Sequence, residues 1–89
     1  ILSPTFNILK KFKIPNSEFE NFYHFDCYRI EKAKEVLALG FEEIIFNPEN
    51  VVVVEWPENI KGIIPKKTIW ICFKVLGGNK RQLTINCKL

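Results

Sequence analysis

Two acidic residues stand out because each one ends an apolar stretch of the sequence. The apolar run of the aromatic-rich segment 19–28 closes on Asp26, and Glu55 follows four consecutive valines at positions 51–54. Open α/β sheets bind ligands outside the carboxyl ends of their strands. Carboxylates at that place supply the hard oxygen ligands that Mg²⁺ takes together with a nucleotide. We therefore regard Asp26 and Glu55 as candidate catalytic and metal-binding residues; the alternative is two solvated loop acids.

Five further side chains could contact a ligand near these acids. Thr5 follows a Ser-Pro pair, and a threonine there could sense a γ-phosphate or form only local turn bonds. Trp56 directly follows the second acid and could stack on a base or anchor the loop. Glu58, in the same loop, could reach a ligand or only water. Lys80 and Arg81 follow a Gly-Gly turn, where they could contact phosphate or be solvated.

The lone histidine and the one basic cluster have plainer interpretations. His24 is the only histidine and lies two residues before the first acid, and we expect it to pack within its strand. Lys10, Lys11 and Lys13 are interleaved with an aromatic residue. We expect them to form a solvated strand face; the alternative is a small RNA-binding domain, which the net charge of only +3 disfavours.

Strands and one helix would position these residues. The valine run lacks alternation, which is typical of a central parallel strand buried on both faces. Residues 22–26 and 51–55 would then form a parallel pair joined by a helical crossover. In the last strand pair, odd-numbered and even-numbered residues of 70–75 would lie on opposite faces. We expect strands at 5–12, 19–28, 51–55, 68–76 and 80–88, a helix at 31–39 capped by Gly40, and a helical turn at 41–46.

Composition places the chain among ordinary globular proteins. Of its 89 residues, 47% are apolar and 26% are charged, which excludes a disordered or low-complexity segment. No apolar run approaches the ~20 residues of a membrane span, and no secretion signal is visible. The three cysteines show no CxxC spacing, so we expect unpaired thiols in a reducing cytosol. Since no segment is long enough to span a membrane, we expect no membrane partner. Because the chain begins with Ile1 rather than Met, we expect a processed protein or a piece of a longer one.

The order of the motifs resembles one family over nearly the whole chain. The series runs SPTF at 3–6, YHFDCYR at 23–29, LGFEE at 39–43, VEWPE at 54–58 and IIP at 63–65. It is similar to the TsaE (formerly YjeE or YdiB) family. These are P-loop ATPase subunits of the bacterial machinery that makes threonylcarbamoyladenosine in tRNA.

The resemblance implies a role for each candidate residue. ATP and Mg²⁺ would be the cofactors, and subunits of the TsaB and TsaD type would be the partners, with tRNA involved only indirectly. The implied roles are a Walker-B-like acid for Asp26, a Mg²⁺ ligand for Glu55, a switch-like segment for Thr5, a place beside the nucleotide for Trp56 and Glu58, and a phosphate contact for Lys80 or Arg81.

The resemblance also implies the fold and one departure from it. We expect an α/β fold, a partial P-loop NTPase-like three-layer sheet with a C-terminal β-hairpin. The family's GDLGAGKT-type loop does not occur in residues 1–89, which we interpret as the C-terminal two-thirds of one domain. The part that carries this loop should also carry a central strand, so one strand of the sheet in residues 1–89 would lack its neighbouring strand. We expect no ATP hydrolysis by this chain alone; the alternative is a nucleotide-independent interaction module of the same complex.

Overall fold

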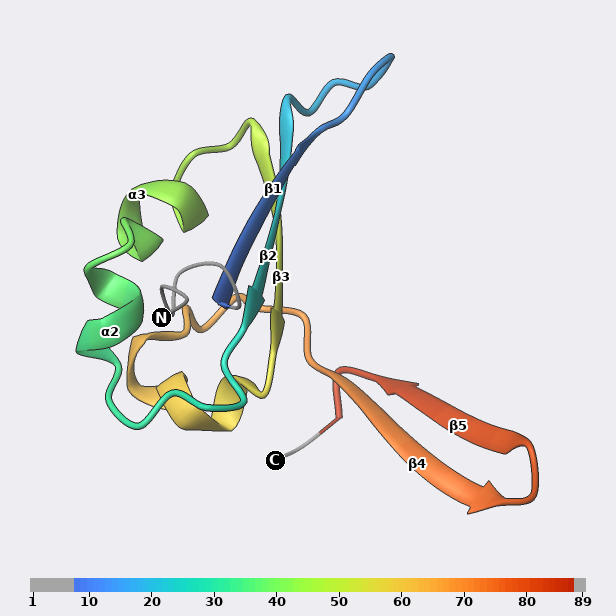
Figure 1. Cartoon of the computed structure of the whole chain (residues 1–89). Coiled ribbons are helices and arrows are strands. Elements are labelled where there is room, and N and C mark those ends of the chain that lie inside the picture. The colour runs from blue at the N-terminus through green and yellow to red at the C-terminus, as the bar shows by residue number, and fades with distance from the viewer. Residues whose placement is uncertain (1–7, 88–89) are drawn as a thin grey trace, which may run out of the picture.

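Two β-sheets and three short helical segments make up the described part of the chain. The computed structural model describes residues 8–87 (Figure 1). A three-stranded sheet forms the main body, and a two-stranded hairpin extends from it. The elements are β1 (Leu9–Lys13), β2 (Asn21–Asp26), α2 (Lys34–Leu37), α3 (Phe41–Ile45), β3 (Asn50–Glu55), the 3-10 helix η1 (Pro57–Ile63), β4 (Ile71–Gly77) and β5 (Lys80–Ile85). The expected mixed α/β fold is confirmed.

The main sheet has the order β1-β2-β3. β1 pairs with β2 antiparallel, whereas β2 and β3 run parallel, with Phe25 opposite Val54 and Asp26 opposite Glu55. The chain between the parallel strands contains α2 and α3, as the expected helical crossover requires. Both candidate acids therefore reach the same end of the sheet.

The core lies on one face of this sheet. Phe25 of β2 is fully buried and meets Phe41 of α3 edge-to-face, with ring centroids 5.1 Å apart. Each side chain of this size stabilises the fold by about 1.5–3 kcal/mol when buried. Figure 1 shows α2 and α3 together on one side of the strands. The fully or almost fully buried residues are Phe25, Cys27, Ile30, Val36, Phe41 and Ile60.

β3 corrects one expectation. The valine run was expected to be buried on both faces, yet among residues 8–87 β3 is an edge strand, and Val53 is 42% exposed. Val52 and Val54 do pack against the core. Val53 points to the other face, because successive side chains alternate along a strand.

The helical segments are shorter than the sequence predicted. The helix expected over 31–39 is regular only over Lys34–Leu37. The Glu35 carboxylate instead accepts the backbone N–H groups of Lys32 and Glu31, each at 3.0 Å, and these bonds lower its pKa. Gly40 separates α2 from α3 with a φ of 85°, a conformation that favours glycine. The helical turn expected at 41–46 is confirmed as α3.

β1 begins later than the sequence predicted. The strand expected over 5–12 starts at Leu9, and Ile8 before it is helical. Thr5 lies outside the described residues. No helix among residues 8–87 has the length and hydrophobicity that crossing a membrane requires.

The hairpin has one apolar and one more polar face, as predicted. Ile71 lies opposite Ile85 and Phe73 opposite Leu83, and all four side chains are at least half exposed. Together with Val75 they form what we call the apolar hairpin face.

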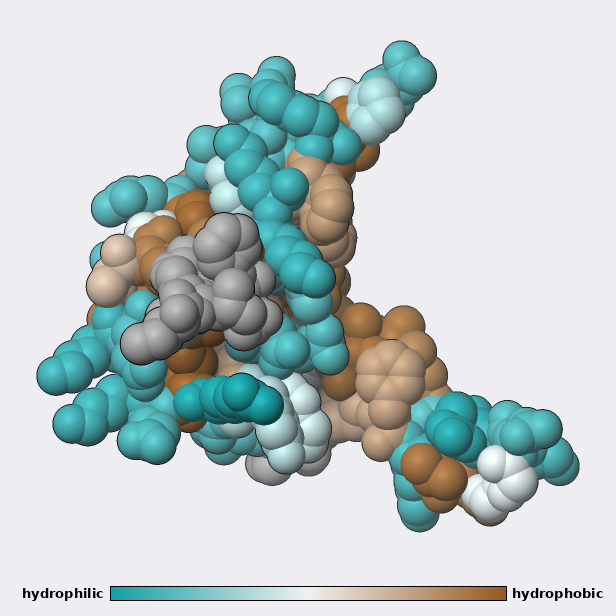
Figure 2. Space-filling view, viewed as in Figure 1, coloured by the Kyte–Doolittle hydropathy of each residue, from teal (hydrophilic) through white to brown (hydrophobic). Residues whose placement is uncertain are grey.

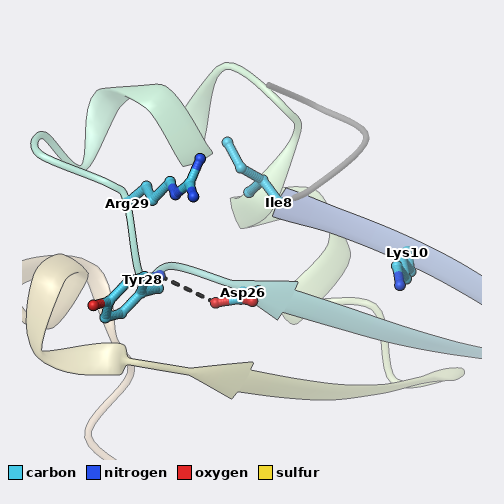
Figure 3. A pocket seen from close by; sticks show the side chains of 5 residues that line it. All are labelled: Ile8, Lys10, Asp26, Tyr28 and Arg29. Carbon is cyan, nitrogen blue, oxygen red and sulfur yellow. Dashed lines mark hydrogen bonds between the residues drawn. The ribbon is translucent and has the colours of Figure 1, made fainter. Parts of the chain in front are cut away.

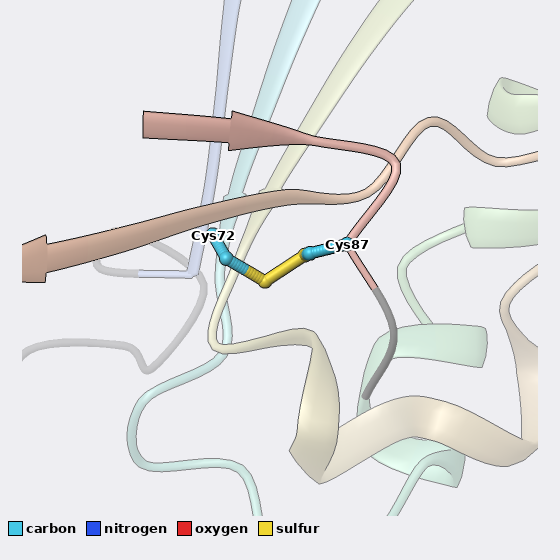
Figure 4. Close-up of a disulfide and its surroundings, with 2 residues drawn as sticks. All are labelled: Cys72 and Cys87. Carbon is cyan, nitrogen blue, oxygen red and sulfur yellow. A yellow bond between two sulfur atoms is a disulfide. The ribbon is translucent and has the colours of Figure 1, made fainter. Parts of the chain in front are cut away.

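The prediction of three unpaired thiols is wrong. Cys72 of β4 and Cys87 form a disulfide (Figure 4). The chain turns at Asn86, with a φ of 59°, and brings the two Cα atoms to 6.1 Å, within the usual range for a disulfide. Only Cys27 is free, and it is buried. Cysteine usage therefore no longer argues for a reducing compartment.

Candidate functional site

Asp26 and Glu55 lie side by side at the carboxyl ends of two parallel strands. They are register partners, so their backbones are about 4.8 Å apart and their side chains point to the same face. The Asp26 carboxylate is oriented by the backbone N–H of Tyr28, which donates to Oδ1 at 3.1 Å (Figure 3). The sequence pattern alone placed these two acids together, and the structure does so.

Glu55 has a partner that sequence reasoning missed. Nε2 of His24 lies 2.5 Å from Oε1 of Glu55, and the side chains are 27% and 55% exposed. His24 was expected only to pack within its strand; instead it holds this carboxylate. A polar contact this exposed adds little to stability. Its effect is to orient Glu55.

A small cavity opens beside Asp26. Its volume is about 400 Å³, and it is lined by Ile8, Lys10, Asp26, Tyr28 and Arg29 (Figure 3). Two cationic side chains thus flank one carboxylate. This mixture suits an anionic ligand that carries a metal ion, because the cations attract phosphate oxygens while the acid attracts the metal. We expected Lys10 to be merely solvated, and Arg29 had no assigned role.

The loop after β3 is held against the loop after β2. Trp56 adopts a left-handed backbone conformation, with a φ of 57°, which is uncommon for an aromatic residue. Its ring packs on Tyr28 with the centroids 5.0 Å apart. Asn59 adds a polar link, because its Nδ2 donates to the carbonyls of Cys27 at 2.8 Å and Tyr28 at 3.2 Å.

Both aromatic rings stay accessible. Trp56 is 49% exposed and Tyr28 is 61% exposed, so they form an open platform beside the acids. Glu58 lies in the first turn of η1, in the same loop as Trp56. Asn59, the next residue along, has a positioning contact through its bonds to the carbonyls of Cys27 and Tyr28.

The structure does not bring the predicted hairpin cations to this place. Lys80 and Arg81 begin β5, at the turn of the hairpin, and Figure 1 shows that turn at the end away from the main sheet. Nη1 of Arg81 donates to the Lys80 carbonyl at 3.1 Å, within its own turn. Their phosphate contact stays a prediction. So does the role of Thr5, which lies outside residues 8–87.

The donor set fits Mg²⁺ only as part of a nucleotide complex. Residues 8–87 contain no cluster of three or more histidine, cysteine, aspartate or glutamate side chains arranged to hold a metal. Mg²⁺ commonly takes just one or two carboxylates, with phosphate oxygens and waters completing its octahedron. Asp26 and Glu55 suit that arrangement. Cys27 does not contribute a thiolate, because burial and then the nearby charge of Asp26 raise its pKa to about 11.

Comparison with known proteins decides the family. Residues 1–83 match the family described as "Threonylcarbamoyl adenosine biosynthesis protein TsaE". The chain belongs to the TsaE family. The resemblance found in the motifs is thereby confirmed.

Curated TsaE proteins from several bacteria are similar to this chain. Those of Rickettsia typhi and Rickettsia prowazekii are 42% identical over 85 and 86 residues, which is 96% and 97% of this chain. The TsaE protein of Borreliella burgdorferi is 32% identical over 79 residues, or 88% of this chain. Each match covers 56% of the relative, so the chain spans about half the length of these TsaE proteins. Each relative is named "tRNA threonylcarbamoyladenosine biosynthesis protein TsaE".

Proposed function

We propose that this chain supplies part of an ATP-binding and ATP-hydrolysing site that supports threonylcarbamoyladenosine biosynthesis in tRNA. Membership of the TsaE family and the names of its relatives support the pathway. One observation supports the chemistry: Asp26 and Glu55 are register partners at the carboxyl ends of parallel strands. That is where open α/β sheets bind their ligands.

Each group around the two acids has a proposed role in binding Mg-ATP. Asp26 and Glu55 would hold Mg²⁺, which when bound neutralises charge on the phosphates and orients them. His24 would keep the Glu55 carboxylate in place through its 2.5 Å contact. Lys10 and Arg29, which line the adjacent cavity, would attract phosphate oxygens.

The aromatic platform and the remaining predicted residues complete the proposal. Trp56, packed on Tyr28, offers an exposed ring face on which a nucleobase could stack. Glu58, Thr5 and the hairpin cations Lys80 and Arg81 keep their proposed nucleotide contacts. Partners of the TsaB and TsaD type, an indirect relation to tRNA and a cytoplasmic location are likewise proposed from the family.

The decisive experiment measures Mg-ATP turnover in a chimera. The matched 85-residue segment of the Rickettsia typhi relative is replaced by this chain. Asp26→Asn and Glu55→Gln should each lower turnover by about tenfold or more, because even outer partners of metal ligands typically contribute 10–100-fold. Glu42→Gln, which neutralises an exposed carboxylate on α3, should leave turnover unchanged. Full activity in both site variants would refute the proposal.

The isolated chain should bind Mg-ATP weakly and hydrolyse none. Residues 1–89 contain no G-x-x-x-x-G-K-S/T sequence, whose backbone amides and lysine hold the phosphates in P-loop enzymes. Robust turnover by the chain alone would contradict this part of the proposal.

A second candidate function is a nucleotide-independent interaction module of the same complex. The observation in its favour is the apolar hairpin face, whose five side chains are all at least half exposed. Under this alternative, a partner subunit would bind the chimera with equal affinity with and without ATP, and Asp26→Asn would not change the affinity. Under the ATPase proposal, ATP or the substitution would change it.

A further inference from the structure

The acidic and basic side chains of this chain are segregated along the sequence. All ten acidic residues lie within residues 1–58, whereas residues 59–89 contain seven lysines and arginines and no acid. The modest net charge of +3 is therefore the sum of an acidic part and a strongly basic part. Such an asymmetry indicates an anionic partner for the basic part, because like charges repel one another until an anion neutralises them.

The basic part folds into the hairpin and the connection that leads to it. Five of its basic side chains are exposed: Lys66 and Lys67 before β4, Lys74 within β4, and Lys80 and Arg81 at the start of β5. Within residues 8–87, no lysine or arginine forms an ion pair with a carboxylate. The cations of the hairpin are thus available to an external anion.

One face of the hairpin gathers polar side chains. Lys74 lies opposite Gln82, and Cys72 lies opposite Thr84. Lys80 precedes Gln82 by two positions, so both point to the same side of β5. We call Lys74, Lys80, Gln82 and Thr84 the polar hairpin face; the apolar hairpin face lies on the other side. Figure 2 shows hydrophilic surface over the outer part of the hairpin. Lysine, glutamine and threonine side chains all donate hydrogen bonds to phosphate oxygens in nucleic acids.

These cations are spaced too widely for one small anion. Lys66 and Lys67 precede one end of β4, and Lys80 follows the other end, while β4 itself is roughly 20 Å long. Figure 1 shows the hairpin extending away from the main sheet, so a long ligand can lie along it. The disulfide between Cys72 and Cys87 holds the base of the hairpin together and thereby keeps this spacing.

The placement of the cations favours a nucleic acid over an anionic membrane. A membrane surface would need lysines and apolar side chains to meet it from the same side. Lys74 and Phe73 are instead neighbours in β4 that point to opposite faces. A nucleic acid repeats its charge at every nucleotide, which suits cations placed in a row. RNA is the nucleic acid that the proposed pathway modifies.

We propose that the polar hairpin face, together with Lys66 and Lys67, binds the phosphate backbone of RNA. The RNA contact thus lies on the hairpin and not at the lysines of β1. This inference goes beyond the proposed function, which gives the chain only an indirect relation to tRNA. It does not depend on ATP binding, because Lys66, Lys67 and Lys74 have no part in the ATPase proposal.

The test measures binding of an unmodified tRNA transcript to the chimera described above, at several salt concentrations and without nucleotide. A triple variant replaces Lys66, Lys67 and Lys74 with glutamine. It should lose at least about tenfold in affinity at low salt. Each phosphate contact contributes about 0.7–0.9 to the slope of log affinity against log salt, so the slope should fall by roughly 2–3.

A matched triple variant controls for net charge. It replaces Lys13, Lys32 and Lys34, which are exposed and lie outside the basic part, with glutamine. This variant carries the same change in charge and should bind tRNA as the unaltered chimera does. Both triple variants should keep the Mg-ATP turnover of the chimera, which shows that they fold.

Several outcomes would overturn the proposal. They are absence of tRNA binding at low salt, equal weakening by the two triple variants, a salt slope that the hairpin substitutions leave unchanged, and loss of turnover in the hairpin variant alone. Binding to vesicles of phosphatidylcholine and phosphatidylserine that is stronger than binding to tRNA would assign the hairpin to a membrane instead. The ATPase proposal is tested separately, by the variants of Asp26 and Glu55.

Discussion

Asn59 should be a principal link between the two loops that carry the candidate site. Its Nδ2 donates to the carbonyl of Cys27 at 2.8 Å and to that of Tyr28 at 3.2 Å. Both carbonyls belong to the segment that directly follows Asp26, whereas Asn59 belongs to the loop that follows Glu55. Asn59→Ala would remove both bonds and leave the two loops joined mainly by ring packing.

The expected loss follows from the two bonds. A hydrogen bond within a protein contributes a net ~0.5–1.5 kcal/mol. The bond to Cys27 is partly buried and should lie near the top of that range, whereas the bond to Tyr28 is exposed and should lie near the bottom. Asn59→Ala should therefore lower the free energy of unfolding by about 2 kcal/mol. That is a large part of the roughly 4–13 kcal/mol expected for a chain of this length.

Urea unfolding, followed by far-ultraviolet circular dichroism, measures this loss. Asn59→Asp is the matched control, because a carboxylate has the same shape but cannot donate to the two carbonyls. It should lose at least as much stability as the alanine variant. If Asn59→Asp is as stable as the unaltered chain, or Asn59→Ala loses less than about 0.5 kcal/mol, the hydrogen bonds do not hold the loops together.

Two other predictions concern the cysteines. Burial raises the pKa of Cys27 from 9.0 to about 11, so the folded state keeps a proton that the unfolded state releases in this range. This contribution to stability is complete below pH 9 and is lost as the pH rises towards 11. The free energy of unfolding, measured in urea, should therefore fall by about 2–3 kcal/mol over this range. The Cys27→Ala variant should not show this fall with pH. Replacing Cys72 and Cys87 with serine should destabilise the hairpin by about 3 kcal/mol, given a separation of 15 residues. Hydrogen exchange should then quicken in β4 and β5 but not in β2; an unchanged hairpin would contradict this.

Local sequence patterns were sufficient for the strands and for the pair of acids. The valine run and the segment ending at Asp26 each carry their own strand signal, and parallel strands necessarily end at one edge of the sheet. The alternation of Ile71, Cys72 and Phe73 likewise fixed the two faces of the hairpin. Gly40 marked the break between two helical segments, because its left-handed conformation is costly for other residues. It does not cap α2 as expected, since that helix ends earlier, with Ala38 at its C-cap.

The remaining features depend on contacts between distant segments. His24 meets Glu55 only because the parallel register places residue 24 opposite residue 53, two positions before the acid. Asn59 reaches carbonyls about 30 positions earlier in the chain. The disulfide depends on a left-handed turn at Asn86, and no nearby glycine in the sequence predicts that turn. The valine run gave a correct strand and a wrong burial, because the burial of each face depends on what packs over it. Val52 and Val54 meet the core, whereas Val53, on the other face, is 42% exposed.

The disulfide also alters the covalent topology of the hairpin. Cys72 and Cys87 close a ring that contains β4, β5 and the exposed Gly77-Gly78 turn, the kind of place where proteases cut. A single cut at that turn would open the ring without releasing either strand, since the sulfur bridge would still join the two pieces. Such a nicked protein would migrate as one polypeptide under non-reducing conditions and separate into two only after reduction.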